Sequence, residues 1–465
     1  MTVSQNRRPN ILFVVIDCAR ADHCSVYGYP RVTTPGLERL AKDGHVFEQA
    51  ISPAGWSLPA HASLFTGLYP SEHGTHDENQ FLDPSVPVLA EEFARAGYRT
   101  MSFCENPWVS RATGLDRGFA HVDDLRLTST GAHRQFNRVA RKLRSVTDPH
   151  TMLPGRVATQ RASAAISELA RGNQPFFMFV HYNEVHTPRR LPERTASSFL
   201  GPRYTWTDAA PLTRDVNGFI AGAVKWGDRE IDVFTALYDA ALAFVDSAID
   251  QLINTLRAER ILDHTLIIIT ADHGENLGEH QLMGHKLCLY DTLLRVPLIL
   301  RFPGVFDGGK RTANQVQTID IAPAIYHMAG LPDPRQSTPN SQRSPLTERV
   351  VPTFAVSEQF RPNLAVFTER YPEFDPKPHD RRLRSIRTDE WKYIWSSDGR
   401  HELFSLRNDA PEEHNVASIY PDVVADLDRQ LTDWVLQFQR APVRSGEVEF
   451  DEIVTSRLRA LGYIP

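Results

Sequence analysis

Apolar runs that end in an aspartate stand out in the hydrophobic pattern of the chain. Two such runs, Asn10–Ile16 and Leu266–Ala271, are rich in β-branched residues and are followed at once by Asp17 and Asp272. Uninterrupted apolar runs of this length are typical of strands buried on both faces of a parallel sheet. Open α/β sheets bind ligands beyond the carboxyl ends of their strands, so we expect both carboxylates at one ligand-binding edge.

Strand-like and helix-like segments alternate through the first 350 residues, which predicts a mostly parallel α/β sheet covered by helices. Further strands are predicted at 100–104, 176–180 and 295–300, and helices at 34–43, 59–66, 86–96, 230–257 and 321–329. Two stretches lack a clear period. The polar, basic stretch 125–165 is interpreted as an insertion or lid, and 190–228 as a long surface loop that could wall a pocket.

The pattern changes after a polar linker at 333–350. Short strands are predicted at 355–356, 364–368, 384–387, 392–396 and 402–405, and a closing helix at 421–439. This order is typical of a smaller α+β domain with an antiparallel sheet. The predicted boundaries are therefore 1–350 for the large domain and 351–465 for the small one.

Composition and charge restrict the partners of the chain. Its 465 residues are 41% hydrophobic and 23% charged, and the net charge of -6 comes without an acidic block or a basic face. Nucleic acid and anionic membranes are therefore not expected as partners. With no signal peptide or transmembrane-length run we expect a cytoplasmic protein. A homo-oligomer is neither indicated nor excluded.

Four scattered cysteines give neither disulfide-framework nor zinc-knuckle spacing. Cys18, beside Asp17, is expected to be a small buried residue rather than a thiolate ligand.

The candidate chemistry lies at the strand ends and at one helix start. Asp17 with the adjacent pair Asp272-His273 is suited to bind one divalent cation. Ser57 comes just before Pro59 at a predicted helix start, and its plain interpretation is an N-cap. The alternative uses the same geometry: a metal-bound hydroxyl at a positive helix terminus can ionise and attack.

Taken together, these segments resemble the sulfatase family of the alkaline phosphatase superfamily. The resemblance is carried by Asp17 with Arg20 and Asp22, by 57–67 and by 272–275, and extends to 179–188, 284–290, 295–297, 319–323, 386–393 and 402–409. It covers nearly the whole chain in the family's order. It implies an alkaline-phosphatase-like sheet between helices, with a smaller carboxyl-terminal α+β domain. The Asp-His pair is similar to that of phosphonate monoester hydrolases and phosphodiesterases.

By position, the resemblance implies a role for each matching residue. It implies metal ligands at Asp17, Ser57, Asp272 and His273. It implies a general acid at His186 and a charge-neutralising lysine at Lys286. Lesser catalytic or substrate-binding roles are implied for His285, Asn79 and Arg20. For Arg20, an ion pair bracing the metal carboxylates is preferred to contact with substrate. Tyr182 stands where two-metal relatives have an aspartate, so one cation is expected, and the imidazole favours manganese, zinc or iron over calcium. His181 is expected to be structural.

The nucleophile position departs from the family pattern. The family has a C/S-x-P-x-R run whose first residue is oxidised to formylglycine, and here His61 replaces the arginine. Two forms remain open, formylglycine at Ser57 or unmodified Ser57, and the missing arginine favours the second. His61 could still donate a hydrogen bond or carry positive charge.

The implied function is hydrolysis of a small anionic sulfate ester, or of a phosphodiester or phosphonate ester. The alternatives are transfer to an acceptor alcohol and a non-catalytic binding protein.

Overall fold

An eight-stranded sheet lies at the centre of the computed structural model, which describes residues 8–124, 153–189, 191–209, 216–306, 308–335, 346, 353–437, 450 and 452–461. The strand order is β10-β2-β9-β6-β1-β5-β3-β4. The strands are β1 (Asn10–Ile16), β2 (His45–Ile51), β3 (Arg99–Cys104), β4 (His121–Asp124), β5 (Phe176–Tyr182), β6 (Thr265–Ala271), β9 (Arg295–Arg301) and β10 (Lys310–Gln317). Only β9 runs antiparallel to its neighbours in this sheet, which confirms the predicted fold class.

The three central strands β5, β1 and β6 fix the position of the site. All three are buried along their whole length. Ile16 of β1 is in register with Tyr182 of β5 and with Ala271 of β6. The residues that follow these strands therefore leave the sheet at the same edge, as predicted for Asp17 and Asp272.

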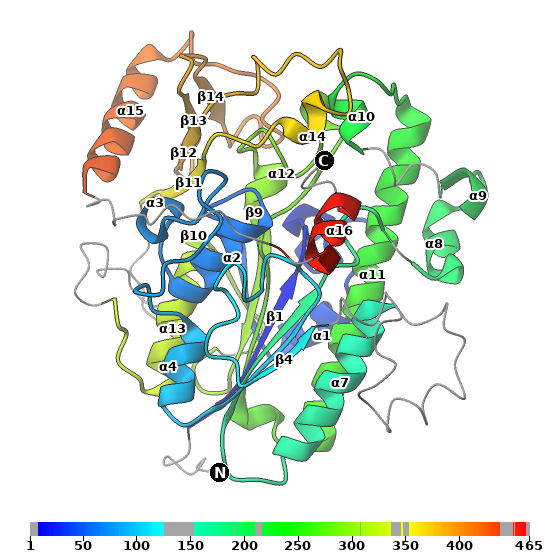
Figure 1. Ribbon diagram of the computed structural model, residues 1–465, viewed down its shortest axis with the longest axis vertical. Helices are drawn as coiled ribbons and strands as arrows, with labels where there is room; N and C mark the ends of the chain where they lie inside the picture. Colours follow the sequence, from blue (N-terminus) through cyan, green and yellow to red (C-terminus); the bar gives the residue numbers. More distant parts are fainter. Residues whose placement is uncertain are drawn as a thin grey trace.

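Helices cover both faces of the sheet (Figure 1). One face carries α1 (Pro35–Lys42), α7 (Pro154–Leu169) and α11 (Asp228–Ala258), and α8 (Glu193–Leu200) packs against α11 on its outer side. The other face carries α2 (Ser57–Thr66), α4 (Leu89–Arg95) and α13 (Ile321–Ala329). The longest, α11, spans 31 residues and buries one continuous face against the core. No helix of the described ranges combines the length and the apolar character needed to span a bilayer.

A second, four-stranded antiparallel sheet follows, as predicted. It consists of β11 (Ala355–Gln359), β12 (Leu383–Arg387), β13 (Trp391–Ser396) and β14 (Glu402–Ser405), and is covered by α15 (Pro421–Leu436). The strand predicted at 364–368 is wrong, because this stretch contains the short helix α14 (Ala365–Thr368). Its Val366 and Phe367 are buried against Leu287 of the site loop, and this packing overrides the strand preference of the local residues.

The two stretches without a period contain more helix than predicted. Helix α7 begins within the predicted 125–165 insertion and continues to Leu169. It buries Val157, Ala158 and Ile166 and belongs to the core. Residues 125–152 lie outside the described residues. The predicted loop 190–228 contains α8, α9 (Trp206–Ala209) and α10 (Val216–Ile220), so the loop prediction is wrong where residues are described. In α8 the cause is a short amphipathic repeat that buries Ala196 and Leu200.

The carboxyl-terminal helix α16 (Glu452–Ala460) returns to the large sheet. Its Leu458 is fully buried in the main core, and Phe450 before it packs edge-on against Trp108, with ring centroids 5.5 Å apart. The remaining short elements are η1 (Ala21–His23), η2 (Ser25–Tyr27), α3 (Pro70–His73), η5 (Leu262–His264), β7 (Asn276–Leu277), η6 (Glu279–Gln281), β8 (Met283–Gly284), α12 (Asp291–Leu294) and η7 (Thr318–Asp320).

Candidate active site and metal centre

The two predicted carboxylates meet at the carboxyl ends of β1 and β6. Asp17 and Asp272 are both fully buried. The backbone N–H groups of Cys18 and His273 donate to Asp272 Oδ1 over 3.3 and 2.9 Å. His273 Nε2 lies 3.9 Å from Asp17 Oδ1 and 3.4 Å from Asp272 Oδ2. The structure therefore places three of the predicted metal ligands around one point.

Ser57 brings a hydroxyl to the same point. It is the first residue of α2, and Trp56 is the N-cap, so the predicted N-cap at Ser57 is wrong by one residue. The Ser57 Oγ lies 3.2 Å from His273 Nε2. His273 Nδ1 faces the Gly274 carbonyl at 2.8 Å. Because a carbonyl only accepts, Nδ1 carries the hydrogen and Nε2 presents its lone pair to the site.

The donor set at this point fits a divalent cation. Two carboxylates, an imidazole lone pair and a hydroxyl are ligands that manganese, zinc and iron accept. Asp272 Oδ2 is buried and accepts no hydrogen bond from the described residues. A buried carboxylate oxygen left in this way is costly unless an ion or water satisfies it. Asp17, Asp272, His273 and Ser57 are the residues that would hold the cation.

Two side chains that contact Asp17 were not assigned to the site from the sequence. Asn106 Nδ2 donates to Asp17 Oδ2 over 2.8 Å, and His181 Nε2 lies 3.4 Å from the same oxygen. His181 is buried at the end of β5. Its place beside β1 could have been found from the strand pairing, whereas Asn106 lies in a coil after β3 that carries no motif. Both can orient the carboxylate, as partners of metal ligands usually do.

His61 contacts the helix that carries the nucleophile. Its Nδ1 donates to the Ser57 carbonyl over 2.8 Å and lies 3.5 Å from Asp272 Oδ2. Burial lowers the pKa of His61 to about 4, although Asp272 acts in the opposite direction. His61 is therefore neutral near pH 7. Of its two predicted roles the structure favours the hydrogen bond, and His61 does not replace the charge of the missing arginine.

His186 and His285 lie together on the other side of His273. Their ring centroids are 4.8 Å apart, and the His285 ring stacks on His273 at 4.8 Å. His186 Nδ1 faces the Thr187 carbonyl. Burial lowers the pKa of both His186 and His285. The general-acid role of His186 and a catalytic role for His285 stay predictions.

Lys286 is half-buried and Asn79 is buried. Burial lowers the pKa of Lys286 to about 8, and nearby Asp77 opposes this shift. Asn79 Nδ2 donates to the carbonyls of Gly74 and Phe81 over 2.6 and 3.2 Å, so the amide nitrogen braces its own loop. Its Oδ1 is buried with no hydrogen-bond partner in the described chain. Substrate binding by Asn79 and charge neutralisation by Lys286 stay predictions.

Arg20 does not brace the metal carboxylates as expected. It donates to Asp22 over 2.8 Å, to Glu279 over 2.6 Å and to the Glu275 carbonyl over 3.1 Å. The turn of η1 places Asp22 within reach of the guanidinium, which then spans to the loop after His273. Arg20 therefore holds that loop in place rather than Asp17 or Asp272.

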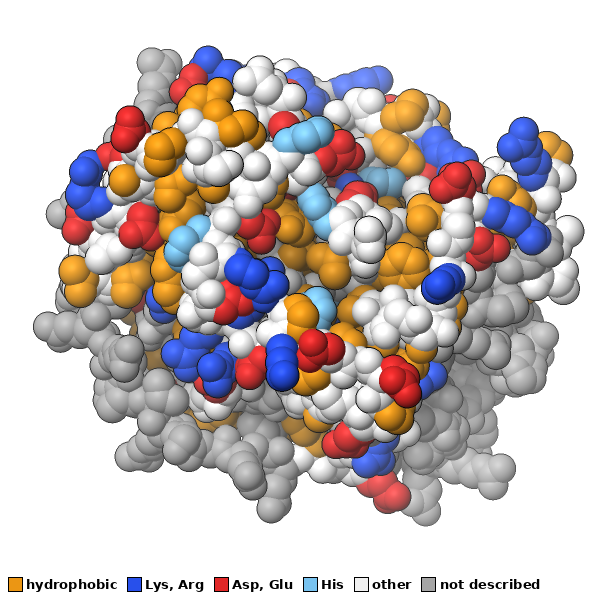
Figure 2. Space-filling model, turned by 90° about the horizontal axis from the view of Figure 1, so that it is seen from above, with side chains coloured by type: hydrophobic (Ala, Val, Ile, Leu, Met, Phe, Trp, Pro, Cys, Tyr) orange, Lys and Arg blue, Asp and Glu red, His pale blue; other side chains and the backbone are white. Residues whose placement is uncertain are grey.

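The site residues lie at the end of the molecule where the central strands finish. Figure 2 shows the molecule from above, with histidine atoms near the middle of the view and both acidic and basic side chains around them.

A family model described as Sulfatase matches residues 9–331, which include every residue of the site described above. The chain belongs to the sulfatase family. It is therefore a sulfatase-family hydrolase, and its fold agrees with the alkaline phosphatase superfamily. A second model, of the carboxyl-terminal part of N-sulphoglucosamine sulphohydrolase, matches residues 278–437 of this sulfatase-family protein.

Relatives and solved structures agree with the family. The chain is 26% identical over 460 residues to arylsulfatase K of Bos taurus, covering 91% of this chain and 81% of the relative. It is 26% identical over 462 residues to the uncharacterized sulfatase YidJ of Escherichia coli (strain K12), with 94% and 89% covered. The phosphonate monoester hydrolase of Silicibacter pomeroyi superposes with a TM-score of 0.72 at 22% identity, covering 96% of this chain and all of that chain. Another similar protein was solved in complex with its substrate D-glucosamine-2-N,6-O-disulfate. It superposes with a TM-score of 0.69 at 20% identity, covering 93% of this chain and 98% of that chain.

Proposed function

We propose that this sulfatase-family protein cleaves small anionic esters with unmodified Ser57 as the nucleophile, at one divalent cation held by Asp17, Asp272 and His273. The observation that supports this most is the 3.2 Å separation of Ser57 Oγ from His273 Nε2, next to two buried carboxylates. A cation bound there would lower the pKa of the serine hydroxyl and polarise the ester.

Each remaining site residue has one role in the first step, the transfer of the phosphoryl or sulfuryl group to Ser57. Ser57 Oγ loses its proton to solvent and forms a bond to phosphorus or sulfur while the bond to the leaving oxygen breaks. Ser57 is the first residue of α2, so the positive end of this helix would stabilise the developing charge. Lys286 neutralises the non-bridging oxygens, and His186, when protonated at Nε2, donates that proton to the leaving oxygen. Water then attacks phosphorus or sulfur, which releases the acid and restores the Ser57 hydroxyl.

Two substrate classes go with the two forms of Ser57. Unmodified Ser57 fits a phosphodiester or phosphonate ester, since water can cleave the serine phosphoester intermediate. The replacement of arginine by neutral His61 and the Asp272-His273 pair support this class. A formylglycine at Ser57 would instead fit a sulfate ester, and the similar structure bound to a disulfated sugar supports that second candidate.

Peptide mass and parallel turnover test the proposal. The Ser57 peptide from the native host should have the unmodified mass, and oxidation would lower it by the mass of two hydrogen atoms. Aryl phosphodiester and aryl phosphonate esters should turn over with manganese or zinc, faster than aryl sulfate. Ser57→Ala should abolish turnover, whereas Ser198→Ala, on the exposed side of α8, should not. An oxidised peptide with preferred sulfate turnover would refute the unmodified form. No turnover of any ester would refute the enzyme.

A further inference from the structure

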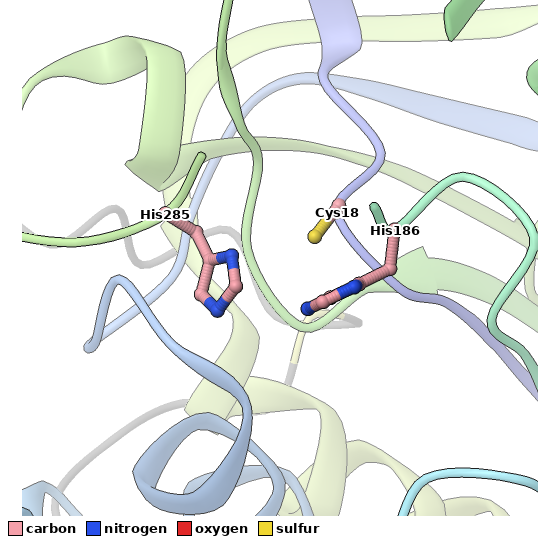
Figure 3. Close-up of side chains that lie close together, drawn as sticks. All are labelled: Cys18, His186 and His285. Carbon is pink, nitrogen blue, oxygen red and sulfur yellow. The ribbon is translucent and has the colours of Figure 1, made fainter. Parts of the chain in front are cut away.

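Three metal-ligating side chains lie together beside the proposed cation site. Cys18 follows β1, His186 follows β5, and His285 follows β8. All three are buried, and their ligand atoms lie within 4.8 Å of one another. Figure 3 shows the thiol and the two rings turned toward one common space. The sequence pattern alone predicts a small buried residue at Cys18 and gives no sign that it lies beside the two histidines.

The backbone at Cys18 fixes the direction of the thiol. Cys18 has a φ of 61°, a left-handed conformation that is uncommon for residues other than glycine. This conformation points its N–H group at Asp272 Oδ1, 3.3 Å away, and its Sγ donates to Asp17 Oδ1 over 3.2 Å. Unfavourable backbone geometry of this kind persists where the surroundings impose it, often at functional sites. The thiol is thus placed between the Asp17 carboxylate and the histidine pair.

His186 presents the nitrogen that a cation needs. Because its Nδ1 faces the Thr187 carbonyl, Nδ1 carries the hydrogen and the lone pair lies on Nε2. Metal-bound histidines usually have this arrangement. Tyr182 is not a competing donor, since its hydroxyl is hydrogen-bonded to Thr159 Oγ1 over 2.9 Å. Cys18, from the neighbouring strand, supplies the third donor instead.

We propose that Cys18, His186 and His285 bind a second divalent cation, zinc or another thiophilic ion, next to the one held by Asp17, Asp272 and His273. One thiolate and two imidazoles are ligands that zinc prefers, and three protein ligands leave one position open. Zinc bonds of about 2.0 to 2.3 Å separate tetrahedral ligand atoms by roughly 3.5 Å, so small side-chain rotations close the cluster. As the sulfur–metal bond forms, the thiol proton passes to solvent.

The two cations would have separate positions. Asp17, Asp272 and His273 would hold the first beside Ser57. Cys18, His186 and His285 would hold the second on the other side of His273. The inference rests on the proposed function only for the position of the leaving oxygen. There the second cation would supply, at His186 Nε2, the positive charge that a proton supplies with one cation.

Metal counting on the full chain tests the inference. The stripped protein is reloaded with zinc and, separately, with cobalt(II), and the metal per chain and the thiolate-to-cobalt charge-transfer band are measured. We expect two ions and the band in the wild type, and one ion without the band in Cys18→Ser. Cys24→Ser is the matched control, because Cys24 is also buried and its Sγ donates to the Arg20 carbonyl over 3.2 Å. It should keep both ions and the band.

A second variant keeps the inference testable if Cys18→Ser does not fold. His285→Asn should also bind one ion, and circular dichroism checks its fold. One ion in the wild type, or a band unchanged in Cys18→Ser, would overturn the second site. Neither result touches the proposed function. That function fails separately, if Asp272→Ala retains turnover and the metal content of the wild type.

Discussion

Arg189→Met is expected to lower the free energy of unfolding by about 3 to 5 kcal/mol, the usual cost of removing one partner of a buried ion pair. Arg189 pairs with Glu275, and both side chains are fully buried. Its guanidinium also lies 4.2 Å from the centroid of the Phe234 ring. Methionine keeps the apolar stem but leaves the Glu275 carboxylate buried without its cation.

The loss should depend on pH. Burial raises the pKa of Glu275 even with Arg189 present, and removing Arg189 should raise it further. Above pH 4.5, the ordinary pKa of a glutamate, the Glu275 carboxyl group of the unfolded chain has released its proton, whereas that of the folded variant still holds it. Its stability therefore falls as pH rises above that value, so the deficit should be larger at pH 8 than at pH 5.

Urea unfolding followed by circular dichroism measures both effects. Arg95→Met is the control, because the Arg95 side chain is 64% exposed in its pair with Glu92, and it should cost less than about 1 kcal/mol. Adding Glu275→Gln to Arg189→Met should restore part of the loss. A deficit in Arg189→Met no larger than that of Arg95→Met, or one independent of pH, would refute the reasoning.

Three further predictions concern the site and its support. Asn106→Ala should weaken cation binding by about 10- to 100-fold in calorimetric titration, because the amide orients Asp17; unchanged affinity would contradict this. The KM for an anionic ester should rise as pH rises through about 8, where Lys286 loses its charge, and should stay level in Lys286→Arg; a level wild-type profile would exclude this role. Burial raises the pKa of Asp320 from 3.8 to about 7, so wild-type stability should fall as pH rises across that interval. Asp320→Asn should lack this fall, and equal slopes in the two proteins would show that Asp320 does not cause it.

The central strands were predictable because their signal is local. The strands β1 and β6 are buried on both faces, so their apolar runs are continuous, and the aspartates after them mark the ligand edge. The sequence pattern does not reveal β10, because this strand pairs only with β2 at the sheet edge and four of its first five residues are polar, with most of the five exposed. Its place depends on the register with β2, which no residue pattern within 310–317 reveals.

Contacts between distant segments explain what was missed at the site. The predicted ligands Asp17, Asp272 and His273 follow from strand ends, and the structure brings them together. The bond from Asn106 to Asp17 joins coils 89 residues apart in the chain. The resemblance implies an ion pair of Arg20 with the metal carboxylates, yet the turn of η1 directs Arg20 to Asp22. Spacing along the chain identifies candidate donors, and only the packed structure decides their partners.

The position of the bound cation tests the central claim most directly. A crystal of the active protein loaded with zinc should be measured at the zinc absorption edge for its anomalous signal. We expect a peak about 2.0 to 2.2 Å from Asp17, Asp272 and the Nε2 of His273. A catalytically competent crystal without a peak at that point would contradict the account.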